Sequence, residues 1–302
     1  MSHAVDQMIP QSPLEAGARP QKTRKNRGGR VGKVSWPVYL MLIIAVLVSV
    51  FPLYYMFVIA SVGASAVTSI PPRLYPGFNF FDIAEKVFAT VPFFRSLLNS
   101  VIVSLSIAVI ASLLCALAGF AFAKLEFAGR NALFVIVLLT MTVPAQLSVI
   151  PQYLIISWLD WVDTLQAIIV PGLASAFGIF WMRQHMATTL SDELMHAARI
   201  DGCNSWQVFW RIGFPVVRPA AFVLGLITFT GVWNDFMWPF IVLKSPELFT
   251  VQIALKQLQA NRTIDLALTM GGSFLATLPL LIVFFFVGRR MVAGIMDGAF
   301  KG

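Results

Sequence analysis

The segment best suited to act on another molecule is a polar stretch, residues 188–213, that separates two long apolar runs. Four of its residues occur at spacings that place them on one face of a helix: Leu194, Ala197, Ala198 and Ile200. Gly202 follows, and a residue without a side chain permits a chain reversal there. A second short helix is expected next, with aromatic residues at Trp206, Phe209 and Trp210. Such a helix–turn–helix fits a groove on a partner protein, although an amphipathic helix at the membrane surface would show the same pattern.

A second polar group falls inside an apolar run, at Trp233, Asn234 and Asp235. A charged residue near the bilayer centre costs about 2.5–3.5 kcal/mol on insertion scales, so Asp235 is expected to face protein or water. Trp233 offers a flat apolar face with one donor, and Asn234 offers donors and an acceptor. The group is either a contact site for a hydroxyl-bearing solute or a set of hydrogen bonds that fastens one helix to its neighbours.

Residue patterns for covalent catalysis, nucleotide binding and metal binding are absent from the sequence. A P-loop requires Gly, four residues, Gly-Lys and then Ser or Thr. The nearest stretch, Gly28 to Lys33, has the wrong spacing and is followed by Val34. Neither a His-Glu-x-x-His helix nor a Gly-x-Ser-x-Gly turn occurs, and the only cysteines are Cys115 and Cys203. We therefore expect no catalytic residue, no metal, no bound cofactor and no disulfide framework in this chain.

Membrane-spanning helices must position these candidate sites. Hydrophobic residues make up 58% of the 302 residues, charged residues make up 12%, and the mean hydropathy is +0.79. A soluble domain carries about 25% charged residues. The apolar residues form runs of the roughly 20 residues that one spanning helix needs. Six helical spans are expected, at about residues 36–62, 96–123, 131–157, 165–186, 215–243 and 268–288.

Basic residues are distributed unevenly between the two sides of these spans. Of the 22 Lys and Arg residues, 16 lie on the side of the amino terminus and 6 lie in the three loops on the other side. Because basic flanks stay in the cytoplasm, both termini are expected there. Residues 1–34 are basic and poor in large apolar side chains, which predicts a disordered cytoplasmic tail. Its position beside a span explains these charges, so we expect no nucleic-acid partner.

The 188–213 segment also resembles a known signature. Permease subunits of ABC importers carry a cytoplasmic loop that reads Glu-Ala-Ala, three residues, Gly, nine residues, Ile, one residue, Leu-Pro. Five positions of this chain fall in register with that signature: Ala197, Ala198, Gly202, Ile212 and Pro215. His196 stands in place of the Glu, and Phe214 stands in place of the Leu. The resemblance implies that His196 and these five residues belong to a coupling loop that docks on a separate ATPase subunit.

Further segments resemble the carbohydrate-uptake branch of the same family, the branch that contains the smaller maltose permease subunit. They are Asn99-Ser100, Ala121 to Lys124, Gly129-Arg130, the motif Trp233 to Phe236 with Asp for the branch's Glu, and the ending Gly298 to Gly302. The resemblance covers almost all of the chain after residue 35. It makes four residues candidates for the translocation path: Asn99, Trp233, Asn234 and Asp235.

The resemblance implies the type-1 ABC importer permease fold, an all-α integral membrane protein of six helices with cytoplasmic coupling helices. The expected parts are a first helix at 35–62, an extracytoplasmic loop at 63–95, a core of five helices at 96–290 and a cytoplasmic tail at 291–302. The implied function is half of the translocation pathway of an ATP-driven sugar importer, with an oligosaccharide favoured, in the bacterial cytoplasmic membrane.

The implied assembly contains several partners besides membrane lipid. They are a second permease subunit, a dimer of ATPase subunits that bind ATP and Mg²⁺, and an extracytoplasmic sugar-binding protein. Two alternatives come from other classes of protein. A secondary transporter driven by an ion gradient would show several ionisable residues deep in its spans, where only Asp235 is expected here. An intramembrane enzyme would need a catalytic motif, and none is present.

Overall fold

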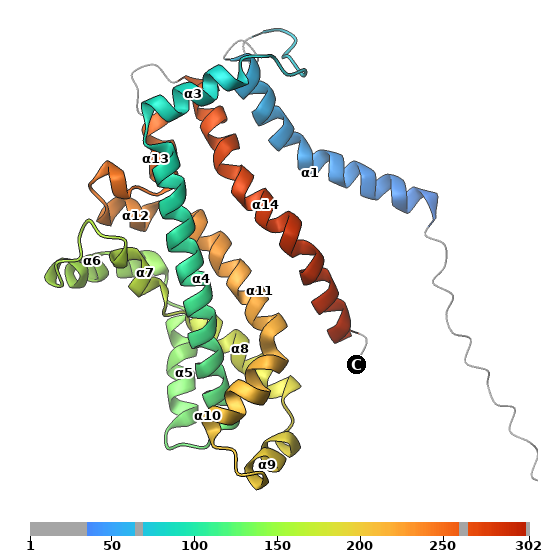
Figure 1. Cartoon of the computed structure of the whole chain (residues 1–302), viewed down its shortest axis with the longest axis vertical. Coiled ribbons are helices and arrows are strands. Elements are labelled where there is room, and N and C mark those ends of the chain that lie inside the picture. Colours follow the sequence, from blue (N-terminus) through green and yellow to red (C-terminus); the bar gives the residue numbers. More distant parts are fainter. Residues whose placement is uncertain (1–34, 64–68, 260–264, 300–302) are drawn as a thin grey trace, which may run out of the picture. The chain divides into compact units, whose positions relative to one another are not determined.

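A computed structural model describes residues 35–63, 69–259 and 265–299, and within these ranges the chain is helical and contains no β-strand (Figure 1). It divides into two compact units, residues 1–50 and 51–302, whose boundary falls within helix α1 (Trp36–Val62). The described residues contain five helical segments long and apolar enough to cross a membrane, or six if one bent pair is counted as a span. The tail expected at residues 1–34 lies outside the described residues.

Three of the expected spans correspond to continuous helices. The first expected span, 36–62, coincides with α1. The second corresponds to α4 (Phe93–Lys124), which begins three residues earlier than expected. The last corresponds to α14 (Leu266–Ala299), which continues through residues 291–299. The segment assigned to a carboxyl-terminal tail is therefore mostly an extension of this helix.

The third expected span, 131–157, is broken. It consists of α5 (Arg130–Thr140), a 3₁₀ turn at Ala145–Ser148 and α6 (Val149–Trp158), and the two arms meet at an angle of 96°. Pro144 lies at the break, where it offers no N–H to continue a helix and disfavours helical geometry in the residue before it. The run expected to form the third span is thus a bent pair of helices rather than one continuous helix.

The fourth and fifth expected spans are also interrupted. The fourth comprises α7 (Gln166–Gly172) and α8 (Ala176–Thr189). The fifth comprises α11 (Phe214–Trp233) and a short α12 (Met237–Val242). Asn234 and Asp235 explain the second break, because such side chains bond to nearby backbone and compete with the helix. Asn234 Nδ2 donates to the Thr230 carbonyl (2.8 Å), and the Asp235 carboxylate accepts from the backbone of Met237 and Trp238.

Two helices lie in segments that the sequence presented as polar loops. They are α3 (Phe80–Thr90) and α13 (Val251–Gln259), and both contribute buried residues to a shared apolar cluster. Both are too short and too polar to show the long apolar run by which a spanning helix is recognised. The segments expected to be loops, 63–95 and 244–265, are thus partly helical, and these helices pack within the unit of residues 51–302.

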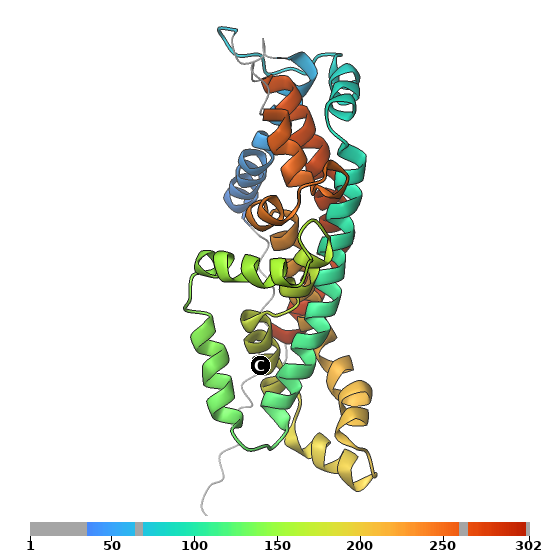
Figure 2. The ribbon, with the colours of Figure 1, turned by 90° about the vertical axis from the view of Figure 1, so that its left-hand side faces the viewer.

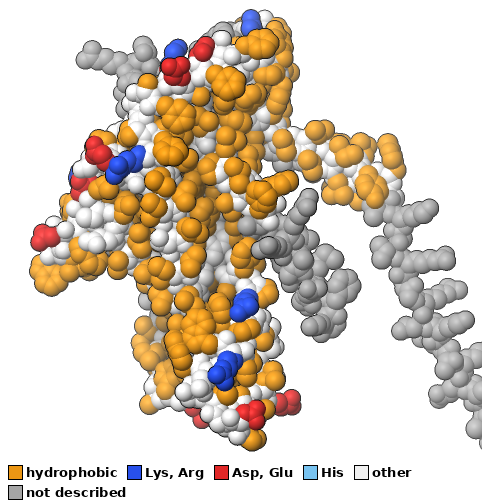
Figure 3. Space-filling model, in the orientation of Figure 1, with side chains coloured by type: hydrophobic (Ala, Val, Ile, Leu, Met, Phe, Trp, Pro, Cys, Tyr) orange, Lys and Arg blue, Asp and Glu red, His pale blue; other side chains and the backbone are white. Residues whose placement is uncertain are grey.

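Helix α4 is the main packing partner within the unit of residues 51–302, where it contacts α8 and α11 (Figure 2). Gly119 allows α8 to approach closely, because a Cβ there would lie 2.7 Å from the backbone nitrogen of Arg183. Trp181 Nε1 donates to the Ala220 carbonyl (3.2 Å) and links α8 to α11. Hydrophobic side chains cover most of the visible face of this unit, as expected for contact with lipid or other subunits (Figure 3).

Candidate coupling and translocation sites

The candidate coupling loop begins with helix α9 (Asp192–Ile200), whose ends are set by its sequence. The Ser191 hydroxyl caps the first turn by accepting a hydrogen bond from the Leu194 N–H (3.4 Å). Asp192 and Glu193 lie in the first turn and Arg199 in the last, an arrangement that complements the helix dipole. These local signals make α9 a defined helix despite its nine residues.

A glycine turn ends α9, as the sequence predicted. Gly202 has a φ of +79°, a left-handed conformation that side-chain-bearing residues rarely adopt. The Cys203 N–H donates to the Ala198 carbonyl (2.9 Å), and the Gly202 N–H donates to the Arg199 carbonyl (3.0 Å). This pair of bonds is a Schellman motif, which satisfies the last carbonyls of a helix.

The second short helix is present as α10 (Ser205–Val208), followed by a π-helical segment at Phe209–Gly213 that continues into α11. Asn204 and Gln207 form a reciprocal capping box, with both hydrogen bonds at 2.9 Å. Ile212 and Pro215 are both half-buried where this segment joins α11. The chain from α9 to α11 is therefore the expected helix–turn–helix, with a single glycine turn between its two arms.

The faces of α9 differ from the expectation in one respect. Ala198 is only 4% exposed and packs, together with Met195, in an apolar cluster that includes Phe120 of α4 and Met186 of α8. It does not share the outward face with Leu194, Ala197 and Ile200, which are exposed; Ile200 is 86% exposed. A step of three residues keeps those three in line, whereas Ala198 lies on the adjacent inward side. The expectation that Ala198 lies on this outward face was wrong.

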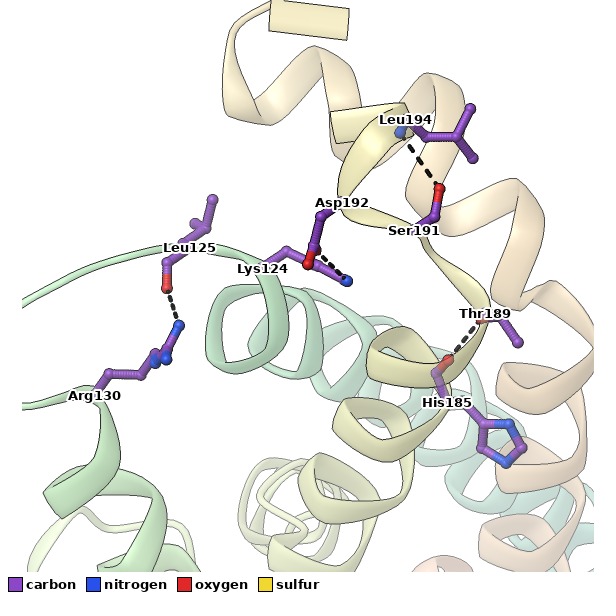
Figure 4. Close-up of polar contacts among 8 residues, drawn as sticks. All are labelled: Lys124, Leu125, Arg130, His185, Thr189, Ser191, Asp192 and Leu194. Atoms are coloured by element: carbon purple, nitrogen blue, oxygen red, sulfur yellow. Dashed lines mark hydrogen bonds and ion pairs between the residues drawn. The ribbon is translucent and has the colours of Figure 1, made fainter. Parts of the chain in front are cut away.

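An ion pair fastens α9 to the membrane-spanning core, and the sequence alone did not reveal it. Lys124 Nζ, at the end of α4, lies 2.7 Å from Asp192 Oδ1 (Figure 4). The hydrogen bond and positive charge of Lys124 lower the pKa of the Asp192 carboxyl below its ordinary value. Nearby, Arg130 Nη1 donates to the Leu125 carbonyl (3.1 Å) and Thr189 Oγ1 to the His185 carbonyl (2.6 Å), which fixes the adjoining turns. Lys124 and Asp192 are 68 positions apart in the sequence, so residue spacing gave no indication that they form a pair.

Two of the candidate translocation residues are engaged within the chain. Asn99 is buried, and its Nδ2 donates to the carbonyls of Glu247 (2.8 Å) and Phe249 (3.1 Å). Trp233 is buried with its ring against Phe229, and its carbonyl accepts from Gln252 Nε2 (3.1 Å). Both residues thus hold the segment 247–252 in place. This arrangement favours the helix-fastening alternative for Asn99 and Trp233.

The other two candidates, Asn234 and Asp235, differ from them in exposure. Asn234 is exposed, and Asp235 is half-buried in the break between α11 and α12. Asn234 donates to the Thr230 carbonyl, and no hydrogen bond from a described residue reaches its amide oxygen, so this oxygen retains capacity for a solute. Within the described ranges, no group of three or more His, Cys, Asp or Glu residues is placed to hold a metal ion.

The fold and the site together define a multi-pass membrane protein with a folded helix–turn–helix that presents an apolar face away from its own core. Residues 108–295 match the family described as the binding-protein-dependent transport system inner membrane component. Because that match covers more than half of the chain, this protein belongs to that family: it is the membrane-embedded permease subunit of an ABC importer.

The chain is also similar to named transport system permease proteins. The chain is 34% identical over 204 residues to the arabinooligosaccharides transport system permease protein AraQ of Halalkalibacterium halodurans, covering 68% of this chain and 73% of the relative. It is 33% identical over 260 residues to the lactose transport system permease protein LacG of Rhizobium radiobacter (85% and 93%). It is 30% identical over 267 residues to the sn-glycerol-3-phosphate transport system permease protein UgpE of Escherichia coli K12 (86% and 95%).

The fold is also similar to that of a solved transporter. The crystal structure of a bacterial ABC transporter involved in the import of the acidic polysaccharide alginate contains a chain with a TM-score of 0.73. The similarity covers 84% of this chain and 94% of the other at 22% sequence identity. At that identity the likeness establishes the fold. The alternative of an ion-driven secondary transporter finds no support in these comparisons.

Proposed function

We propose that this subunit forms half of the translocation pathway of an ATP-driven sugar importer and docks through α9 on a separate ATPase subunit. The observation that carries the proposal is the outward face of α9. Leu194 and Ile200 are exposed there, while Met195 and Ala198 anchor the same helix to the core. An exposed apolar helix face on a rigid base suits a groove on a partner.

The family description supports the remaining components of the proposed assembly. A binding-protein-dependent system requires an extracytoplasmic binding protein, and an importer of this kind hydrolyses ATP on subunits other than the permease. We propose a dimer of such ATPases carrying ATP and Mg²⁺, a second permease subunit, and both termini of this chain in the cytoplasm. ATP-driven closure of the ATPases would move α9. The attached helices α4, α8 and α11 would then move with it and convert the permease between its inward-facing and outward-facing states.

Sugars are the proposed solutes because two of the named relatives, AraQ and LacG, are permeases for arabinooligosaccharides and lactose. UgpE is named for a smaller, phosphorylated polyol, so the proposal favours hydroxyl-rich solutes and an oligosaccharide first. Of the four candidate residues, Asn234 is the best placed to bind hydroxyl groups, because its side chain is exposed and its amide oxygen can still accept a hydrogen bond.

Co-purification tests the assembly. A tagged chain, extracted from its native membrane with mild detergent, should retain an ATPase, a second permease and a binding protein, identified by mass spectrometry. Leu194→Ala combined with Ile200→Ala should lower ATPase recovery while leaving the second permease bound. Glu126→Ala is the matched control, because Glu126 is an exposed residue on the neighbouring turn. It should change neither the recovery of the ATPase nor that of the second permease. Recovery of the ATPase at the normal ratio from the double variant would refute docking through α9.

His196 offers a finer test of the same contact. Its side chain is exposed, so His196→Glu restores the acid of the family signature without disturbing the packing beneath. Equal uptake by the variant and the parent would indicate that His only fills space at the contact. Loss of uptake with normal assembly would indicate a partner surface adapted to His.

A further inference from the structure

Four side chains, each four residues from the next, form a continuous row of contacts where α10 leads into α11, and the rings in this row meet edge to face. The ring centroids of Trp206 and Trp210 lie 5.6 Å apart, and those of Trp210 and Phe214 lie 5.5 Å apart. The Arg218 guanidinium carbon lies 5.9 Å from the Phe214 ring centroid. A step of four slightly exceeds one α-helical turn, and the wider turn of the π-helical segment Phe209–Gly213 counters that drift. We name these four residues the aromatic–arginine ladder.

The ladder is a surface feature. Trp206 is 60% exposed and Trp210 37% exposed, and Arg218 is exposed as well. Arg211, in the adjoining turn, is also exposed. Among the residues whose side chains are described, Lys124 and Asp192 form the only ion pair, so no described carboxylate neutralises Arg211 or Arg218. The face therefore combines exposed aromatic rings with two uncompensated positive charges, and basic side chains lie among hydrophobic ones at this end of the unit (Figure 3).

The length of the helix places this face at the edge of a bilayer. The candidate span Ser205–Trp233 has 29 residues, of which α11 contributes 20. Twenty residues rise about 30 Å, which matches the thickness of the hydrocarbon core. Trp206 and Trp210 then lie at the level of the lipid headgroups, where tryptophan is enriched. Arg218 lies one turn inside Phe214, and its contact with that ring shows that the side chain reaches back toward the headgroups.

We propose that the ladder and Arg211 bind the phosphate headgroup of an anionic phospholipid in the adjoining leaflet. Guanidinium groups form charge-assisted, paired hydrogen bonds to phosphate, and basic residues at a membrane surface attract anionic lipids. The aromatic rings supply an apolar wall for the upper acyl chain. A lipid suits this face better than the ATPase because the rings continue into the membrane span, whereas the proposed docking residues Leu194 and Ile200 lie on α9. Such a lipid would fix the depth of the segment that carries α9.

Lipid retention by the full-length chain tests this proposal. The subunit is reconstituted in nanodiscs of equal parts phosphatidylcholine and phosphatidylglycerol, released, and examined by native mass spectrometry. The ratio of retained phosphatidylglycerol to phosphatidylcholine should fall about fivefold for Arg218→Gln, which corresponds to roughly 1 kcal/mol for one basic residue near an anionic surface. Arg211→Gln combined with Arg218→Gln should lower it further, while Arg218→Lys should retain most of it. Because a misfolded variant would lose both lipids, the ratio separates headgroup recognition from poor folding.

Arg199→Gln is the matched control, because Arg199 is exposed on α9 and contacts no aromatic ring of the described residues. It should leave the ratio unchanged. An unchanged ratio in the Arg211→Gln/Arg218→Gln variant would overturn the proposal. So would competition by millimolar inorganic phosphate as effective as that by phosphatidylglycerol, because the site would then recognise a free anion.

Tryptophan quenching locates the lipid. Brominated phosphatidylglycerol should quench the emission more than brominated phosphatidylcholine, and Trp210→Phe should reduce that difference. The difference should persist after the ATPase is added. Its disappearance on ATPase binding would assign the ladder to the protein interface and contradict a lipid site.

Discussion

The ammonium of Lys124 meets the carboxylate of Asp192 at 2.7 Å, which joins the last turn of α4 to the first turn of α9. The Lys124 side chain is 7% exposed, whereas that of Asp192 is 78% exposed. The lysine is thus fixed by its surroundings, and α9 places an acid over it. One end of α9 is held by this pair and its middle by the buried Met195 and Ala198. A force on α9 would therefore be passed to α4.

We predict that Asp192→Asn and Lys124→Gln each lower the transport obtained per ATP hydrolysed in the reconstituted importer. Asp192→Asn should have the larger effect, because it leaves a poorly exposed ammonium without its counter-charge. The exchanged pair, Lys124→Asp with Asp192→Lys, should recover part of the loss, although a lysine at the start of α9 opposes the helix dipole. Non-additive losses in the double-mutant cycle would establish the coupling. Strictly additive losses would show that the pair transmits nothing.

The pair also has a predictable pH dependence. The pKa of Asp192 is lowered, chiefly by the hydrogen bond and charge of Lys124. The stabilisation is therefore present above the ordinary carboxyl pKa of about 3.9 and is lost only as the pH falls through the lowered value. Hydrogen exchange of the α9 amides, corrected for the intrinsic rate, should be unchanged from pH 8 to about pH 5 in the wild-type subunit. Loss of protection at pH 6 would contradict this assignment.

Gly202 should be sensitive to substitution through its backbone alone. A Cβ at Gly202 would meet nothing within 4 Å, but its φ of +79° strains any L side chain. Gly202→Ala should lower the stability of the α9 turn by about 1–2 kcal/mol. Gly231→Ala is the matched control, because Gly231 also has open space and lies within α11 without a positive φ. Hydrogen exchange of α9 in the two variants compares them directly, and equal exchange would argue against backbone strain.

The neighbouring alanines Ala197 and Ala198 should respond in opposite ways. Ala198 is buried in the α4–α8–α9 cluster, so Ala198→Leu should cost about 1–3 kcal/mol by overpacking and lower the thermal stability of the isolated subunit. Ala197 is exposed, so Ala197→Leu should leave that stability within about 0.5 kcal/mol and instead weaken ATPase recovery. Thermal melts in detergent and co-purification separate the two effects. If Ala198→Leu melts normally and alone disrupts docking, the inward assignment of Ala198 is incorrect.

These two alanines illustrate which features of the structure the sequence predicted and which it did not. The run of apolar residues predicted the continuous helices α1, α4 and α14 well, because a bilayer demands unbroken apolar length. The signature spacing located the turn at Gly202, because a left-handed residue strongly favours glycine. The same spacing predicted that Ala197 and Ala198 share one helix face. Which of two adjacent residues is buried depends on tertiary packing, which the sequence pattern does not show. The Lys124–Asp192 pair and the use of Asn99 as a loop anchor depend on contacts between distant segments, which no local pattern encodes.

The proposed membrane orientation is tested by labelling. Single cysteines at Ser12 and Gly298, in a background with Cys115 and Cys203 replaced by serine, should resist impermeant thiol reagents in intact cells. They should react after the cells are opened. The reason is the excess of basic residues on the side of both termini, 16 of 22. Labelling of either position from outside the cell would reverse the orientation and would also place α9 on the wrong side for an ATPase.

Asn99 and Asn234 should separate structural from solute-binding roles near the break between α11 and α12. Asn99→Ala removes the amide that donates to the Glu247 and Phe249 carbonyls. It should lower the free energy of unfolding by about 1–3 kcal/mol and reduce the yield of the complex, without altering solute preference. Asn234→Ala removes an exposed amide and should change the apparent affinity for the transported solute while assembly stays normal. Asp235→Asn keeps the shape of the Asp235 side chain but removes its charge, so it tests the contribution of that charge. Binding-protein-dependent uptake in vesicles, measured over a panel of oligosaccharides, decides between the roles. Normal selectivity with reduced assembly in Asn234→Ala would assign that residue, like Asn99, to the fastening of helices and would remove this cluster from the proposed path.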